Sequence, residues 1–139
     1  MKRTETREQS FRLIYSIEIQ KDMDEEQVEL FLQENGIEEK TEIEYVKEVF
    51  VGIKENKEEI LTLIQNNLKE KWSVDRISKI DLSILEVAIF ELIFSKLPYK
   101  VVINEAVELA KKYGDDNSKA FVNGILASIV KEKKLAEEE

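Results

Sequence analysis

Apolar positions recur every three or four residues along most of the chain, a spacing typical of amphipathic helices. No segment alternates cleanly between apolar and polar positions, as a strand with one exposed face would. The pattern predicts an all-α protein with about seven helices, over residues 4–20, 24–34, 41–55, from 56 onward, 74–96, 101–113 and 117–133.

Short polar motifs suggest where two of these helices begin. Thr6 and Gln9 have the spacing of a capping box at the first helix, and Thr4 is an alternative cap. Asn56 and Glu59 have a similar spacing at the fourth helix. Both motifs predict side chains that accept hydrogen bonds from free backbone N–H groups.

The segment 80–93 is apolar on most sides, so we expect it at the centre of a helical bundle. A break is expected near Lys79, and Pro98 ends this segment because the residue before proline disfavours helix. Gly114 is a natural stop for the next helix. The charged tail, residues 131–139, is expected to fray.

Composition narrows the class of protein. The chain has 139 residues, 42% hydrophobic and 37% charged, which suits a single folded domain. It has neither cysteine nor histidine, which excludes disulfides and removes the commonest general base and metal ligand. We therefore expect no cofactor and no metal site.

No apolar run reaches the roughly 20 residues of a membrane helix, and no signal core follows the N-terminal charges, so a cytoplasmic protein is expected.

The net charge of −9 is unevenly distributed. Residues 1–16 carry four basic and two acidic side chains, whereas residues 17–70 carry six basic and sixteen acidic ones. The remaining residues are almost balanced, with eleven basic and twelve acidic side chains. A basic N-terminus on an acidic chain leaves room for a local contact with nucleic acid.

Two acidic pairs are candidate metal or acid–base sites, Asp22 with Asp24 and Asp115 with Asp116. Both pairs lie at expected helix starts, where aspartate caps the backbone, and this structural role is the preferred interpretation. No phosphate loop, nucleophile elbow or dinucleotide fingerprint is present. The sequence therefore predicts a protein that is not an enzyme.

Two further features have open interpretations. Arg3 and Arg7 are four residues apart on one helix face and suit phosphate binding, with Tyr15 as a ring further along; a solvated helix end is an equal alternative. Gly124 lies inside an expected helix, where glycine costs about 1 kcal/mol relative to alanine. Close packing of another helix is the preferred reason, and approach of a nucleotide is the alternative.

Three stretches of the chain resemble the NusB family. The first is residues 7–8 (RE) followed by 13–16 (LIYS), and the second is residues 81–92 (DLSILEVAIFEL). The third and most specific is residues 98–114 (PYKVVINEAVELAKKYG) followed by 121–126 (FVNGIL). Together they span the start, centre and end of the chain.

The resemblance implies one domain over residues 1–139, with helical subdomains at roughly 1–72 and 73–133, three helices and then four. It implies binding to the single-stranded boxA element of ribosomal RNA leaders together with NusE, a ribosomal protein. The pair would join other Nus factors on the RNA polymerase elongation complex and suppress premature termination.

The resemblance also implies roles for individual residues. Arg7 and Tyr15 match the RNA-binding first helix, Phe121 matches an aromatic residue near the RNA, and Asn117 lies in the loop before it. Asp81 matches an acidic position on the face that meets NusE. Lys2, Arg3 and Lys119 are the further candidate phosphate contacts.

Two departures from the family pattern suggest weaker RNA binding. Residues 4–6 (TET) interrupt the usual run of arginines, and Ala120 stands where a basic residue is common. The alternatives to an RNA-binding antitermination factor are therefore a protein-interaction module with little RNA affinity of its own and an RNA-modification adaptor.

Overall fold

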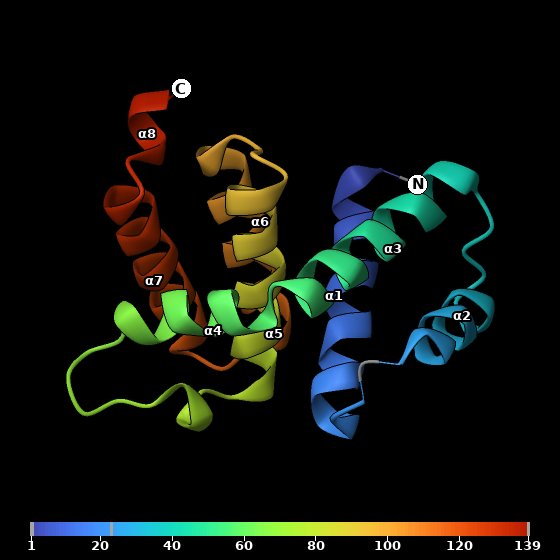
Figure 1. Cartoon of the computed structure of the whole chain (residues 1–139), viewed down its shortest axis with the longest axis horizontal. Helices are drawn as coiled ribbons and strands as arrows, with labels where there is room; N and C mark the ends of the chain where they lie inside the picture. Colours follow the sequence, from blue (N-terminus) through green and yellow to red (C-terminus); the bar gives the residue numbers. More distant parts are fainter. Residues whose placement is uncertain (1, 23, 139) are drawn as a thin grey trace.

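The computed structural model describes residues 2–22 and 24–138, and every regular element within them is helical (Figure 1). The main helices are α1 (Arg3–Gln20), α2 (Glu25–Glu34), α3 (Lys40–Glu55), α4 (Lys57–Asn66), α5 (Lys79–Ile89), α6 (Tyr99–Tyr113) and α7 (Ser118–Glu132). The expected all-α architecture of seven helices is confirmed for this part of the chain. Figure 1 shows α1 to α3 on one side of the molecule and α4 to α7 on the other.

The expected helix 74–96 consists of three pieces. A 3-10 turn, η1 (Val74–Arg76), precedes α5, and a π-helical turn, η2 (Phe90–Phe94), continues it. The break near Lys79 is confirmed, because Ser78 ends the extended link and its side chain accepts a hydrogen bond from the N–H of Asp81 at 3.1 Å. The wide turn of η2 ends where the N–H of Ser95 bonds the carbonyl of Phe90.

The helix caps agree only in part with the sequence. Asp24 caps α2 by accepting the N–H of Glu26 at 3.0 Å, as expected for an aspartate at a helix start. The capping box at Thr6 is wrong, because α1 already begins at Arg3. Asn56 immediately precedes α4, as expected, but its side chain does not cap this helix, since its N–H group donates to the carbonyl of Gly52 at 2.8 Å and closes the end of α3.

Helix α5 lies at the centre of the core, as its apolar run predicts. Every residue from 81 to 92 is buried, and α1, α6 and α7 all pack against α5. Gly52 on α3 permits the close approach of η2, because a Cβ at this position would lie 1.9 Å from the ring of Phe90. A side chain at position 52 would therefore push α3 away from the core.

One buried polar cluster joins three helices. The ammonium group of Lys57 at the start of α4 contacts the carboxyl groups of Glu18 of α1 and Glu86 of α5. The second carboxylate oxygen of Glu86 has no hydrogen-bond partner among the described residues. Burial raises the pKa of Glu86 to about 8, although the charge of Lys57 acts in the opposite direction.

The described part of the tail is largely helical, whereas the sequence predicts that it frays. A last short helix, α8 (Leu135–Glu138), follows α7, and Leu135 packs partly against the core. The end of the expected tail, residue 139, lies outside the described residues. Across the described chain, the helices are too short or too polar to span a membrane.

Candidate nucleic-acid interface

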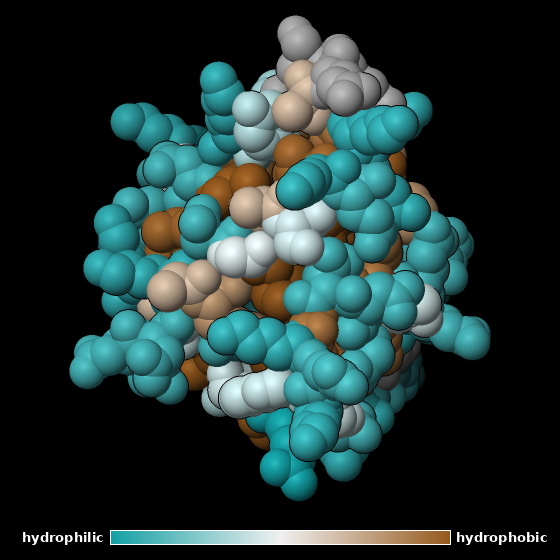
Figure 2. Space-filling model, turned by 90° about the vertical axis from the view of Figure 1, so that its left-hand side faces the viewer, coloured by the Kyte–Doolittle hydropathy of each residue, from teal (hydrophilic) through white to brown (hydrophobic). Residues whose placement is uncertain are grey.

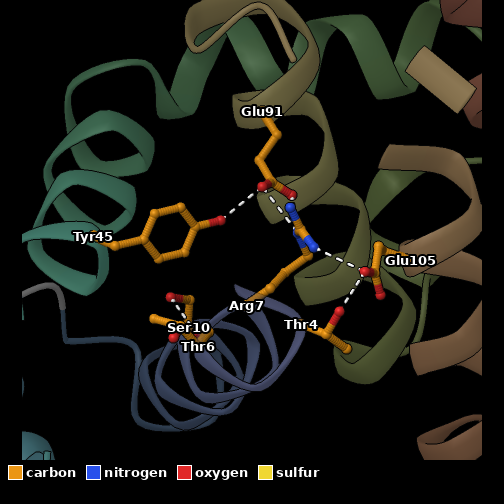
Figure 3. Close-up of polar contacts among 7 residues, drawn as sticks. All are labelled: Thr4, Thr6, Arg7, Ser10, Tyr45, Glu91 and Glu105. Carbon is orange, nitrogen blue, oxygen red and sulfur yellow. Dashed lines mark hydrogen bonds and ion pairs between the residues drawn. The ribbon is translucent and has the colours of Figure 1, made fainter. Parts of the chain in front are cut away.

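Arg7 lies inside the protein at the meeting point of three elements (Figure 3). Its side chain is only 5% exposed, and Nε donates to both carboxylate oxygens of Glu91 at 2.8 and 2.9 Å. Its terminal nitrogen pairs with Glu105 at 3.2 Å. Glu91 also accepts the hydroxyl of Tyr45 at 2.6 Å, and Glu105 accepts that of Thr4 at 2.6 Å.

The expectation that Arg7 shares an exposed face with Arg3 is therefore wrong. Burial alone would lower the pKa of Arg7, but the hydrogen bond and charge of Glu91 outweigh it, and the guanidinium stays charged. Nε and one terminal nitrogen of Arg7 are already paired with carboxylates, and the buried guanidinium leaves little access for a phosphate. Arg7 holds α1 against η2 and α6 and positions the helix start that carries the exposed basic residues.

Lys2 and Arg3 are exposed at the start of α1. The guanidinium carbon of Arg3 lies 3.9 Å from the centre of the Tyr45 ring, in a cation–π contact. Tyr45 therefore links the buried Glu91 to the surface arginine, a connection that sequence spacing does not reveal. The contact orients Arg3 while leaving its charge accessible to solvent.

Tyr15 is half-buried rather than a free platform. Its ring stacks on Phe11 with centroids 6.3 Å apart, and Phe11 packs on Tyr113 of α6 at 4.9 Å. Beside this aromatic row, Glu8 pairs with Lys112 at 2.5 Å and accepts the hydroxyl of Tyr113. Burial alone would raise the pKa of Glu8, but these two hydrogen bonds outweigh it and lower the pKa.

The loop between α6 and α7 presents the second group of candidates. Asn117 and Lys119 are exposed, and the N–H of Asn117 donates to the Asp115 carboxylate at 2.8 Å. Ser118 is buried, and its hydroxyl donates to the same carboxylate at 3.3 Å. Asp115 therefore has the structural role that its position predicts, and it organises the turn before α7.

Phe121 is half-buried on α7 and lines a groove of about 460 Å³ between α7 and the segment that follows α4. Gly124, one turn further along α7, lines the same groove. A Cβ built on Gly124 would meet no described atom within 4 Å, so the preferred explanation by helix packing is wrong. The opposite wall includes Trp72, which is 54% exposed and which sequence reasoning did not select.

Asp81 is only 9% exposed, between the starts of α5 and α7. Burial raises its pKa, while a hydrogen bond with Ser118 lowers it and nearby Asp115 raises it. One oxygen of Asp81 is buried with no hydrogen-bond partner among the described residues. The polar turn at Ser118 therefore covers part of this side chain, and the NusE contact expected for Asp81 stays a prediction.

The structure does not bring all the candidate residues into one site. Thr4, next to Arg3, bonds the side chain of Glu105 on α6, whereas Asn117 follows the end of α6. The nine residues of α6 from Glu105 to Tyr113 extend about 12 Å along the helix, so the two groups lie toward opposite ends of this part of α6. One group is Lys2 with Arg3, and the other is Asn117, Lys119 and Phe121.

Comparison with known proteins identifies the family. The model of the NusB family matches residues 4–131. The chain belongs to the NusB family. The transcription antitermination protein NusB of Finegoldia magna is 41% identical over 137 residues, which cover 98% of each chain.

Solved NusB structures share the fold. NusB of T. maritima superposes with a TM-score of 0.88 at 40% identity, covering 99% of this chain and 98% of that one. A structure of the antitermination factors NusB and NusE in complex with double-stranded RNA gives a TM-score of 0.85 at 30% identity, with 94% and 96% covered. The resemblance of the three sequence stretches to the NusB family is thereby confirmed over nearly the whole chain.

Proposed function

We propose that this protein is a cytoplasmic transcription antitermination factor that binds RNA together with NusE and has no catalytic role. The observation that carries the proposal is the arrangement of exposed basic and aromatic side chains on an acidic chain. Lys2 and Arg3 are exposed at one end of α1, and Lys119 is exposed beside the half-buried Phe121 on α7. Its NusB relatives are named as antitermination proteins, and one solved relative is in complex with NusE and RNA.

The proposed mechanism is tethering. Lysine and arginine side chains contact phosphates and fix the RNA strand, and aromatic rings stack on unpaired bases. The separation of the two basic groups suits an extended single strand better than a compact ligand. With boxA RNA and NusE bound, the protein would join the other Nus factors on the RNA polymerase elongation complex.

The NusE contact is proposed for the surface around Asp81 rather than for its buried oxygen. Asp81→Asn keeps the shape of the side chain and removes its charge, so it tests the electrostatic part of the contact. Asp81→Lys would instead place a long cation in a 9% exposed position and would disturb α7 as well.

The test is fluorescence anisotropy of a labelled single-stranded boxA RNA titrated with the protein, with and without NusE. We expect saturable binding that NusE strengthens and that a scrambled RNA of the same length lacks. An unchanged anisotropy in the presence of NusE would reject the proposal.

One observation favours a second candidate, a protein-interaction module with little RNA affinity. Burial of Arg7 removes one of the few basic groups at the N-terminus, while residues 17–70 carry ten more acidic than basic side chains. Such a module would leave the RNA anisotropy unchanged in this titration. It would still bind NusE, which calorimetry measures.

A further inference from the structure

The groove beside Phe121 lies between two parts of the chain that are far apart in sequence. Its lining residues are Asn67, Leu68, Lys69, Trp72, Ala120, Phe121, Gly124 and Ile125. Figure 2 views the molecule from the side of α7 and shows apolar side chains in the middle of this face, surrounded by polar ones. A groove of about 460 Å³ is in the size range of sites that hold small organic rings.

Polar contacts fix the two walls of the groove relative to each other. Asn67 at the end of α4 accepts the hydroxyl of Ser128 on α7 at 2.5 Å. Gln65 donates to the carbonyl of Trp72 at 2.9 Å and accepts the N–H of Val74 at 3.0 Å. The wall that carries Trp72 is therefore held in place before any ligand arrives.

Trp72 is presented to solvent by an unusual backbone conformation. The preceding residue, Lys71, has a backbone φ of +75°, a value that residues other than glycine rarely adopt. Trp72 is the chain's only tryptophan, and it is 54% exposed at the groove. Covering a large exposed apolar ring with a flat apolar partner is favourable, because it removes apolar surface from water.

Gly124 leaves the floor of the groove open. No described atom lies within 4 Å of the Cβ that another residue would have there, so no packing contact inside the chain requires glycine. The absence of a side chain gives a flat ligand direct access to the backbone of α7 between Phe121 and Ile125.

The charge of the groove selects among possible occupants. Lys69 is the one charged residue in its lining, and Lys119 is exposed near its α7 wall. A second copy of this chain would bring a net charge of −9 without a reason to place a flat ring here. An RNA strand supplies both features, because each base offers a π-face and each phosphate a negative charge.

We propose that this groove is a stacking site for one unpaired RNA base, in which Trp72 and Phe121 provide the rings and Lys69 contacts the adjoining phosphate. The proposal rests on the RNA-binding function proposed above. It adds the segment between α4 and η1 to the RNA interface and extends that interface away from Lys2 and Arg3.

The experiment uses the fluorescence of Trp72 as the reporter, with a NusE variant that lacks tryptophan. Titration with single-stranded boxA RNA is expected to quench Trp72 over the same concentration range in which the anisotropy of a labelled RNA rises. Trp72→Leu is expected to raise Kd about five- to 150-fold, the range for loss of one base–aromatic stack. Trp72→Phe retains a ring and should retain most of the affinity.

The matched control is Leu30→Ala, because Leu30 is 50% exposed on α2, away from the groove. It should leave Kd unchanged, and circular dichroism should show every variant folded. A second variant, Gly124→Leu, fills the floor of the groove while residue 72 remains tryptophan, and it should also weaken RNA binding.

Three results would overturn the proposal. RNA that binds with unchanged Trp72 fluorescence, and equally well to the Trp72→Leu variant, would reject the stacking site and leave the RNA-binding function intact. A Trp72→Leu variant that changes self-association in ultracentrifugation but not RNA affinity would assign the groove to a second copy. If neither the unsubstituted protein nor any variant bound RNA in the presence of NusE, both the RNA-binding function and the stacking site would be rejected.

Discussion

Arg7 and Glu91 are 84 residues apart in sequence and form a buried ion pair in which one guanidinium nitrogen lies 2.8 and 2.9 Å from the two carboxylate oxygens. The pair joins the first helix to the wide turn after the central helix. Its neighbours Tyr45 and Glu105 complete the hydrogen bonding (Figure 3). An arginine selected as an RNA contact from its spacing is therefore part of the interior.

The first prediction concerns this pair. Arg7→Ala leaves the carboxylate of Glu91 buried without its cation and should lower the free energy of unfolding by about 3–5 kcal/mol. Urea unfolding followed by circular dichroism measures the change. Arg12→Ala, at an exposed position of the same helix, is the control and should change stability by less than about 0.5 kcal/mol. Equal unfolding midpoints for the two variants would contradict the structural role of Arg7.

The second prediction concerns the salt dependence of RNA binding. Three exposed cations, Lys2, Arg3 and Lys119, are proposed as phosphate contacts, and Lys69 adds a fourth at the groove. Each contact with single-stranded RNA contributes about −0.7 to the slope of log K against log salt concentration, so the total should be roughly −2 to −3. Replacing Lys2 and Arg3 together by alanine should make the slope shallower by about 1.4. A slope much steeper than about −4 would mean that the RNA lies on a different surface.

The third prediction concerns stability and pH. Glu86 is fully buried between Lys57 and Glu18, and burial raises its pKa from 4.5 to about 8. Between these values the folded protein keeps a proton that the unfolded chain has lost, so stability falls as pH rises, by at most about 1.4 kcal/mol per pH unit. Glu86→Gln should therefore flatten the fall between pH 5 and pH 8 (roughly the window between the two pKa values). Thermal unfolding at several pH values measures this, and parallel curves for the two proteins would disprove it.

The fourth prediction compares two glycines that lie inside helices. Gly124→Ala should raise the free energy of unfolding by up to about 1 kcal/mol, because alanine is the better helix former and the added Cβ meets no described atom within 4 Å. Gly52→Ala places a Cβ 1.9 Å from the Phe90 ring and should lower stability by about 1–3 kcal/mol. Urea unfolding of the two variants measures both changes. If both substitutions raised the free energy of unfolding, or both lowered it, the space described around one of the two glycines would be contradicted.

The sequence alone determined the helical architecture. The three-to-four spacing of apolar residues is a local property, and it located the seven main helices, although the expected helix 74–96 is divided into η1, α5 and η2. The apolar run of residues 80–93 identified the central helix, because only a helix covered on all sides can be apolar all round. Family membership followed from three contiguous stretches, which also need no knowledge of distant contacts.

The tertiary structure decided which polar residues are exposed. Arg7 and Arg3 are one helical turn apart, but carboxylates from η2 and α6 enclose only Arg7. Asp81 is covered because Ser118, 37 positions later, folds over it, and no local pattern predicts that contact. Trp72 and Gly124 belong to one groove only because the end of α4 and the segment after it lie against α7. Helix formation depends on near neighbours in sequence, whereas burial and pairing of side chains depend on contacts between distant segments.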